Sequence, residues 1–409
     1  MTVNVIGSAR GTQWGPPANS AVVFVNSLGN DSLTGDTPGN AKLTLAAAIG
    51  ALPSGGGCVM VGKGGVAQGT TEFDAPAGLR IQGAHRGQSI INCATDPGAS
   101  TAAFQCYGGG ENTATVISDV TIVGPLGSGY IPSPGVALGV SGWGVLTGNQ
   151  TVLQRVNVAG FYANVCIGST AEYLEDVQAA AGWYNLYFVN TVTHGGQYLN
   201  NMQLYTAALA GIGIGNGANI SAARAVGVGT GQSPYGVYIE PRTGGAIANC
   251  NLEISFESIG NELVHDASTG GNSTPAISGT TWRVGEFSYS SGEKASAYPS
   301  EYSFYATMWD TVFVNFGGQY GLGTGPPGGT AAFGSPLGSS FCNFDTLPHG
   351  QQVDGTSLAN AYGIPQRPTT NFIAGSNVTI TPTDDQANQR TGITIAASGA
   401  QFNIGEGAP

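Results

Sequence analysis

The fold is decided by the stretch LQRVNVAGFYANVCIGSTAEYLEDVQAAAGWYNLYFVN, which runs from Leu153 to Asn190 and contains one pattern twice. Each copy opens with an apolar residue that is followed three and five positions later by two more, as in LQRVNV and LEDVQA. The pattern recurs as LNNMQL, ISAARA and IANCNL, so that copies begin at Leu153, Leu174, Leu199, Ile220 and Ile247. A unit of 21 to 27 residues cannot bury its own apolar face, so we expect the copies to stack into a solenoid.

Each copy continues to a small residue and a second alternating run. Because Asn and Gly tolerate a left-handed backbone, we expect sharp corners at Asn164, Asn185, Gly211, Gly236 and Asn261. Alternation after the corner puts one set of apolar pairs on a single face: Val165/Ile167, Leu186/Phe188, Ile212/Ile214 and Val237/Ile239. The pattern predicts an all-β chain that forms a right-handed parallel β-helix over residues 58–275, and leucine-rich repeats are disfavoured because their own consensus is absent.

The composition agrees with strands and turns, since 67 residues are glycine and only 9% are charged. A net charge of −12 argues against a nucleic-acid partner, which requires clustered cations. No apolar run approaches the roughly 20 residues of a membrane span, and the first residues lack a signal-peptide pattern, so we expect synthesis in the cytoplasm without membrane insertion. Six cysteines form no C-x-x-C pair, which favours buried free thiols, as at Cys58, Cys93 and Cys166.

Upstream of the repeats lies NDSLTGDTPGNAKLTLAAAIGALPSGGGCVMVGKG, Asn30 to Gly64. Leu45, Ala48, Ile49 and Leu52 form the stripe of a short helix. The segment resembles the start of pectate-lyase-like β-helix proteins: an Asn/Asp/Gly turn, a short helix, a Pro-Ser-Gly-Gly turn and the first strand. The resemblance implies that residues 25–57 form a turn and a helix that cap the open end of the solenoid.

Downstream, residues 286–320 are dense in Tyr, Phe and Trp, which either pack in a β region spanning 276–345 or stack on sugar rings. Residues 346–409 are expected to hold a linker and a hairpin in NFIAGSNVTITPTDDQANQRTGITIAAS, Asn371 to Ser398. This segment is similar to hairpins near the ends of bacteriophage tail-fibre and tailspike proteins. The resemblance implies a homotrimeric virion protein of the phage tail, with other tail proteins and host surface glycan as partners and with the arm 1–24 as a candidate attachment segment.

A candidate catalytic site follows from aligning the coils on their corner residues. Glu240 and His265 then share an outward column, with Asp266 and Arg242 nearby. Glycan-cleaving enzymes use paired carboxylates, so Glu240, His265 and Asp266 are the catalytic candidates. A solvated salt bridge or a hydrogen-bonded histidine is the alternative interpretation. Glu262 would occupy an inward column in this alignment, which indicates that the register could slip by one residue and turn His265 into the core.

Binding candidates are chosen for flat faces and hydrogen-bonding groups that suit sugars. They are Tyr238, Arg242, Tyr298, Tyr302 and Trp309. No metal or cofactor is expected: DSLTGD at 31–36 lacks calcium-loop spacing, and GIGIGNG, GVGTGQ and GKGG fail the phosphate-loop motifs. THGGQ, around His194, matches only faintly the Gly-His-Gly element of polygalacturonases.

The leading hypothesis is adhesion to host-envelope glycan by a phage tail protein. The alternatives are a glycan depolymerase, either a hydrolase or a lyase, on the same β-helix, and a purely architectural tail component. The sequence favours a protein that is not an enzyme, because the catalytic elements of polygalacturonases and pectate lyases are not matched.

Overall fold

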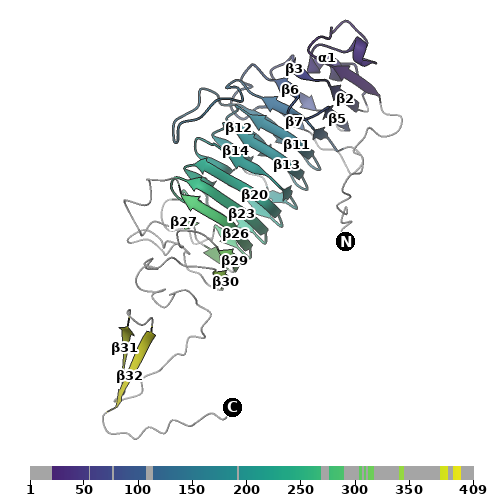
Figure 1. Ribbon diagram of the computed structural model, residues 1–409. Coiled ribbons are helices and arrows are strands. Elements are labelled where there is room, and N and C mark those ends of the chain that lie inside the picture. Colours follow the sequence, from purple (N-terminus) through teal and green to yellow (C-terminus); the bar gives the residue numbers. More distant parts are fainter. Residues whose placement is uncertain are drawn as a thin grey trace, which may run out of the picture. The chain divides into compact units, whose positions relative to one another are not determined.

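The computed structural model describes residues 21–54, 56–75, 78–106, 114–190, 193–268 and 276–289, together with the short strands between 304 and 397 given below. The chain divides into two units, residues 1–364 and 365–409. All strand pairs described in the first unit are parallel, and stacked coils form three sheets of a β-helix (Figure 1). The predicted fold class is confirmed.

The largest sheet, sheet A, has 16 strands among the described residues. They are β1 (Val22–Val25), β2 (Gly57–Val61), β3 (Gly64–Ala67), β5 (Leu79–Gly83), β6 (Ser89–Asn92), β8 (Val116–Ser118), β9 (Thr121–Val123), β11 (Val152–Ala159), β13 (Tyr173–Ala180), β16 (Tyr198–Asn200), β17 (Gln203–Tyr205), β20 (Arg224–Ser233), β23 (Asn251–Ile259), β26 (Thr281–Tyr289), β29 (Val312–Phe316) and β30 (Ser340–Phe344).

Two smaller sheets complete the coils. Sheet B contains β4 (Asp74–Ala75), β7 (Ala102–Cys106), β10 (Trp143–Thr147), β12 (Ala163–Ile167), β14 (Tyr184–Phe188), β18 (Ala210–Ile214), β21 (Tyr235–Ile239), β24 (Val264–Asp266) and β27 (Phe304–Tyr305). Sheet C contains β15 (Thr193–Gly195), β19 (Asn219–Ser221), β22 (Ile247–Ala248), β25 (Ile277–Ser278) and β28 (Met308–Trp309). Parallel pairing reaches beyond residues 58–275 at both ends, because β1 pairs with β2 and β26 with β29.

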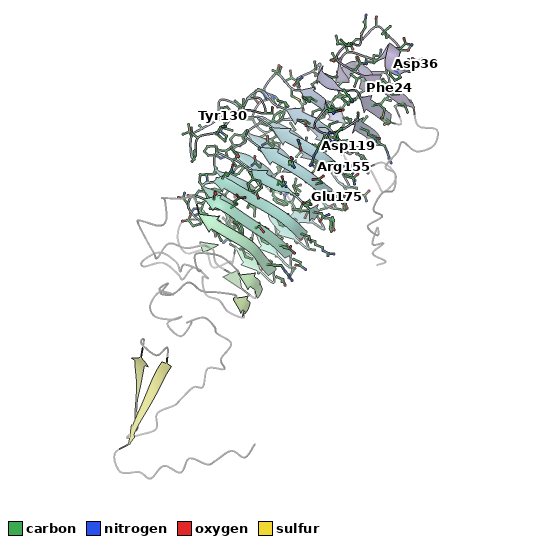
Figure 2. The ribbon with its side chains drawn as sticks, viewed as in Figure 1. Phe24, Asp36, Asp119, Tyr130, Arg155 and Glu175 are labelled. Atoms are coloured by element: carbon green, nitrogen blue, oxygen red, sulfur yellow. The ribbon has the colours of Figure 1, made fainter. Side chains whose placement is uncertain are left out.

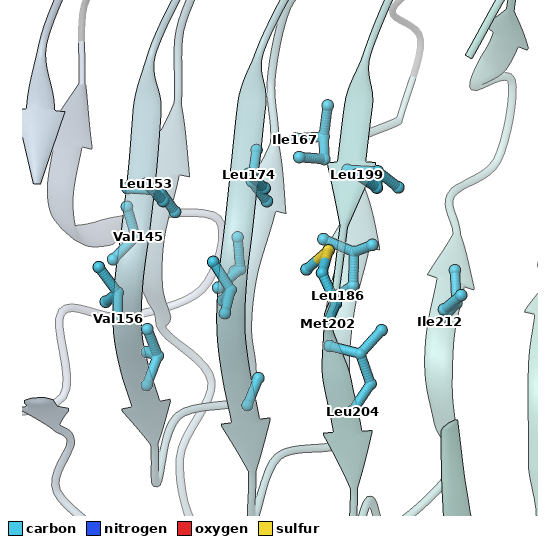
Figure 3. Packing of buried hydrophobic residues seen from close by; sticks show 14 of the residues in the cluster. Val145, Leu153, Val156, Ile167, Leu174, Leu186, Leu199, Met202, Leu204 and Ile212 are labelled. Carbon is cyan, nitrogen blue, oxygen red and sulfur yellow. The ribbon is translucent and has the colours of Figure 1, made fainter. Parts of the chain in front are cut away.

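The interior is a stack of apolar columns, one residue from each coil. Leu153, Leu174 and Leu199 follow one another in register on sheet A and are buried (Figure 3). On sheet B the predicted inward pairs, such as Leu186/Phe188, are buried as expected. Burial of each such side chain contributes about 1.5–3 kcal/mol, which a single coil could not obtain alone.

The predicted corners are wrong. Asn164, Asn185, Gly211 and Gly236 lie inside strands β12, β14, β18 and β21, and none of them, nor Asn261, has a positive φ. Buried Asn164 instead donates from Nδ2 to Asn185 Oδ1 (2.9 Å) and to Ala180 O (2.8 Å). Asn164 and Asn185 therefore form a side-chain ladder that satisfies buried backbone groups. In the sequence alone, an asparagine between two apolar runs has the same pattern as a turn.

The true corners have left-handed residues of many types. One column of left-handed residues runs through Gln150, Ala171, Gly196, Ala222, Asn249 and Gly279. From Gln150 to Asn249, the backbone N–H of each member donates to the carbonyl of the residue that precedes the next member. Another column runs through Asp119, Arg155, Asp176, Asn201 and Gly227. The cost of a left-handed non-glycine residue is offset here by the stacked hydrogen bonds, so residue type marks these corners poorly.

The register of the last two repeat copies also differs from the prediction. Leu199 pairs with Ala225, whereas Ile220 lies in sheet C between His194 on one side and Ile247 on the other. Every copy has a left-handed third residue, for example Arg155 in the first copy. The pattern therefore marks a corner that occurs at two places of the coil.

The open end is capped as predicted. Helix α1 (Leu45–Gly50) begins at Thr44, whose Oγ1 accepts from Ala47 N, and it buries Leu45, Ala48 and Ile49. A 3-10 turn, η1 (Pro38–Asn40), precedes it. The Asp31 carboxylate accepts from Leu43 N (2.8 Å) and Thr44 N (2.9 Å), so this part of the DSLTGD segment fastens the cap.

The second unit, described by itself, contains the predicted hairpin. Strand β31 (Val378–Asp385) pairs antiparallel with β32 (Arg390–Ala397), with Ile380 opposite Ile395.

Candidate functional site

An aromatic cluster lies on the outer side of sheet B, separate from the interior columns of the same strands. The aromatic face, as the name is used below, consists of Trp143, Tyr162, Trp183, Tyr184, Tyr187, Tyr235, Tyr238 and His265. Trp143, Tyr184 and Tyr187 are buried, whereas the other members are half-exposed. Within β14 and β21 the outward rings stand three residues apart, as Tyr184 and Tyr187 do and as Tyr235 and Tyr238 do, and together the aromatic side chains cover this side of the sheet.

The Tyr184 ring lies over the next coil, which has glycine at the position beneath the ring. A Cβ added at Gly213 would meet the Tyr184 ring at 2.5–2.8 Å, so no larger residue fits without moving the ring. A Cβ at Gly215 would similarly meet the Tyr187 hydroxyl at 2.7 Å. Gly213 and Gly215 of GIGIGNG are thus the floor on which two tyrosines rest, and neither is a corner or part of a phosphate loop. Gly217 of the same motif lies in a turn with a φ of 77°.

Both tyrosines reach Glu240, two coils away. The hydroxyls of Tyr184 and Tyr187 each lie 3.2 Å from Glu240 Oε1, and Asn216 N donates to Oε2 at 3.0 Å. The Tyr187 hydroxyl also contacts Asn190 Oδ1. Burial, and secondly the charge of Glu240, raise the pKa of Tyr184 and Tyr187 well above the usual range, so both remain neutral donors.

A second group of rings follows on the last coils of the sheet. Tyr238 pairs with His265 across two strands, and their rings stack at 5.3 Å and 17°. Tyr235 lies 4.7 Å from the His265 ring. Glu262 Oε2 lies 3.5 Å from His265 Nδ1. Burial, and secondly Glu262, raise the pKa of Tyr235.

The predicted catalytic set is not assembled. His265 stands opposite Tyr238, and the bond from Ala267 N to Ile239 O places Ala267, rather than His265, opposite Glu240. The register differs by two residues from the prediction because Gly236 aligns with Leu263 instead of Asn261. His265 nevertheless stays on the outside, so the anticipated turn into the core does not occur.

Asp266 is buried, and it pairs with Ile239 of the preceding coil in the same interior column. Arg242 Nη2 donates to Asp266 Oδ2 at 2.6 Å, and these side chains are only 2% and 8% exposed. Arg242 N also donates to Ser268 Oγ. Both residues therefore form a buried ion pair that closes a turn, and neither is placed to touch a ligand on the aromatic face.

Among the described residues near Glu240, the other outward carboxylate is Glu262. Its aligned position is that of Tyr235, five residues from Glu240 along the strand. At about 3.3 Å per residue the two backbone positions are about 16 Å apart. Glycoside hydrolysis needs carboxyl groups about 5–9.5 Å apart. Moreover, Glu240 turns toward Tyr184 and Tyr187, in coils on the side away from Glu262.

The binding candidates have mixed outcomes. Tyr238 lies on the aromatic face, and Arg242 is buried. Tyr298 and Tyr302 lie outside the described residues. Trp309 belongs to β28, where it pairs with Ser278, and its side chain is outside the described part. Sequence reasoning missed Tyr162, Trp183, Tyr184, Tyr187 and Tyr235. The signal was available in YNLYF, where Tyr184 and Tyr187 flank the inward Leu186.

Titratable groups also gather inside the part of the coils between sheets B and A, where Glu172 precedes β13 and His194 belongs to β15 of sheet C. Buried Glu172 accepts from Ser169 N (2.9 Å) and Gln197 Nε2 (3.2 Å), and burial raises its pKa from 4.5 to about 7. The ring nitrogens of buried His194 lie 3.2 Å from Ser169 O and 3.0 Å from Val189 O. Burial lowers the pKa of His194 despite these two contacts. THGGQ is thus a structural corner.

Further features limit the chemistry of the described residues. No three His, Cys, Asp or Glu side chains within them come together as a metal site. Asp36 accepts from Thr34 Oγ1 at 2.7 Å, so it is engaged locally, as is Asp31. Cys58, Cys93, Cys106, Cys166 and Cys250 are buried free thiols, as predicted. No helix in the part of the chain described is long and apolar enough to cross a membrane.

Comparison with known proteins gives distant likenesses. No family model matches the chain, and no curated protein matches it. Among solved structures, the ORF18 protein of Geobacillus virus E2 is 12% identical with a TM-score of 0.37, covering 58% of this chain and 51% of its own. The A-module of the mannuronan C-5 epimerase AlgE6 from Azotobacter vinelandii is 14% identical with a TM-score of 0.37, covering 74% of this chain and 89% of its own.

The enzymatically active domain of tailspike protein 2 from bacteriophage CBA120 is 12% identical with a TM-score of 0.31, covering 85% of this chain and 54% of its own. This chain thus spans about half the length of the two phage proteins. At such identities and TM-scores these likenesses carry no argument about activity, and the β-helix rests on the strand pairing of the chain itself.

Proposed function

We propose that this protein is an adhesive component of a phage tail that binds cell-envelope glycan through the aromatic face. The observation that carries the proposal is the row of half-exposed rings on the outside of sheet B, backed by a buried layer of tyrosines. The phage setting, the homotrimer and the contact with other tail proteins rest on the sequence of the hairpin at Asn371–Ser398.

The half-exposed rings have the properties that sugar binding requires. Tyr162 and Trp183 are stacked, with ring centroids 6.2 Å apart and ring planes 11° apart, so the pair presents an apolar surface whose two rings are packed against each other. The C–H faces of a pyranose ring are apolar, so they gain by leaving water against such a surface. Rings that are already packed lose little conformational entropy on binding, which favours affinity.

Polar atoms beside the rings supply orientation. Glu240 is fixed by Tyr184, Tyr187 and Asn216 N, so its remaining acceptor capacity is held in place. A pyranose hydroxyl is a suitable donor to such a carboxylate. The same geometry supports binding better than cleavage, because the backbone positions of Glu240 and Glu262 are about 16 Å apart along the strand and Glu240 turns away from Glu262.

A glycan microarray and a whole-cell pull-down with purified protein test the proposal. Trp183→Ala and Tyr238→Ala each remove one partly buried ring of the face, and we expect each to reduce binding by about tenfold or more, the usual loss at a central aromatic contact. Tyr173→Ala and Tyr198→Ala are the matched controls: these rings stack at 5.0 Å and 9° and are also half-exposed, but they lie on sheet A. They should leave binding unchanged.

Two results would contradict the assignment to this face. One is an equal loss of binding in the sheet B variants and in the sheet A controls, and the other is full binding in all four variants. Release of reducing ends or unsaturated sugars, abolished by Glu240→Gln, would instead favour the depolymerase. A folded protein that binds neither cells nor glycans would favour the architectural alternative.

A further inference from the structure

The aromatic face presents two separate platforms. The first is Tyr162 with Trp183, and the second is Tyr235, Tyr238 and His265. Between Trp183 and Tyr235 the sheet advances by two coils, from β14 through β18 to β21, which is about 10 Å at the usual strand spacing. From β12 to β24 the distance is about 19 Å.

The strand between the two platforms contributes only small side chains to the outer side of the sheet. Strand β18 contributes Ala210 and Gly213 there, and Gly213 lies under the Tyr184 ring. Leu209, half-buried, packs against the same cluster. A ligand that lies on both platforms thus crosses an apolar step whose surface is formed by the buried Tyr184 ring over Gly213 and by half-buried Leu209.

The face also lacks cations. Strands β4, β7, β10, β12, β14, β18, β21 and β24 contain no Lys or Arg, and neither do residues 160–168, 181–190, 207–217, 233–241 and 260–268. The nearby Arg242 is buried against Asp266. The outward charged groups of the described strands are acidic: Glu240 and Glu262 lie beside the rings, and exposed Asp74 lies farther along the sheet in β4, so an anionic ligand would meet repulsion with no compensating ion pair.

Both carboxylates already have polar partners, and those of Glu240 leave it acceptor capacity for a single further donor such as a hydroxyl. Glu240 already accepts from two tyrosine hydroxyls and from Asn216 N. Glu262 lies 3.5 Å from His265 Nδ1. Exchanging these partners for an ammonium group would cost the hydrogen bonds that hold the rings.

From these observations, and resting on the proposed function, we infer that the ligand is an uncharged, extended glycan chain that lies along the solenoid axis across both platforms. A chain that occupies one platform places the next units near the other at high effective concentration. Affinity should therefore rise with chain length until both platforms are filled. Polyuronates and phosphate-bearing polymers should be excluded.

Isothermal titration calorimetry tests this with the whole chain. The probes are neutral oligosaccharides of two, four and six units from the chains that bind on the array, oligogalacturonates of the same lengths, and chitosan oligosaccharides. We expect a neutral hexamer to bind about tenfold or more tightly than the dimer. Trp183→Ala or Tyr238→Ala should each bring the hexamer close to the dimer. Binding should change little between low and high salt.

The possible failures are distinguishable. Tighter binding of oligogalacturonate or chitosan than of every neutral chain, still dependent on Trp183, would overturn the uncharged class while leaving the proposed function intact. Equal affinity of dimer and hexamer would overturn the two-platform geometry. Absence of binding by all three classes in a folded protein would overturn the proposed function, and this inference with it.

Discussion

The outer faces of sheets A and B are carried by the same coils but present different kinds of side chains. Sheet A presents the ring pair Tyr173/Tyr198 among polar partners such as Gln178 with Gln203. Another polar pair, Arg155 with Asp119, is labelled in Figure 2. Sheet B presents rings on a floor of glycine. Since the interior columns of both are apolar and fully buried, the fold does not require this difference. Binding specificity therefore belongs to outward columns that the core leaves free.

The corner between the two faces should give the largest effect on stability. Burial holds the pKa of Glu172 at about 7, above its unfolded value of 4.5. The folded state thus binds the proton more tightly, so the contribution is fully present below pH 4.5 and is lost as pH rises through 7. The shift corresponds to as much as about 3 kcal/mol.

Thermal unfolding of wild type and Glu172→Gln at pH 5 and pH 8 measures this. We expect the wild type to lose more stability than the variant on going to pH 8. His194 pulls in the opposite direction, because its lowered pKa removes stability as pH falls, and it is present in both proteins. Identical pH dependence of the two proteins would contradict the role of Glu172.

Glycine should matter on one face and not on the other. Gly213→Ala drives a Cβ into the Tyr184 ring, and we expect a loss of about 2 kcal/mol together with weaker glycan binding. Gly229→Ala on sheet A meets chiefly the Tyr205 hydroxyl, the mobile end of its side chain, and should cost under about 1 kcal/mol. Denaturant titration compares them, and equal losses would argue against the glycine floor.

The hydroxyl of Tyr184 should stabilise the aromatic face by a smaller amount. Tyr184→Phe removes one donor to Glu240 while Tyr187 retains the other, so we expect a cost of about 1 kcal/mol. A double-mutant cycle with Glu240→Gln isolates the coupling. A coupling energy of zero would mean that Glu240 does not hold this ring.

The polar face should give the smallest effect. Arg155 donates to both Asp119 oxygens, at 2.5 and 2.7 Å, but its side chain is 45% exposed. Arg155→Ala should cost about 0.2–1 kcal/mol, less at high salt, with glycan binding unchanged. A salt-independent loss of several kcal/mol would show that this face is more than a solvated surface.

Sequence patterns predicted what burial dictates. The cap helix and the inward pairs followed from periodicity, because a coil that fails to bury Leu186 or Leu45 does not stack. The corners did not follow, since left-handed positions hold Ala171, Ala222 and Arg155 rather than glycine alone. Coil lengths vary, so a small residue such as Asn261 misaligned the last coil by two positions.

The candidate site was harder to predict than the fold. Tyr238 was identified as an outward aromatic residue, but the grouping around Glu240 depends on side chains that lean across two coils. That lean is permitted by Gly213 in the intervening coil. Residue spacing along one coil does not predict such contacts, because they depend on whether the neighbouring coils have small residues that leave room for the side chain.

Hydroxyl-radical footprinting with and without a bound glycan tests the central claim most directly, because it reports which rings the ligand covers. The account predicts that Trp183 and Tyr238 become protected when a binding glycan is added, while Tyr173 and Tyr198 on sheet A react as before. Protection of Tyr173 and Tyr198 with Trp183 and Tyr238 unprotected would place the glycan on the other face and contradict the account.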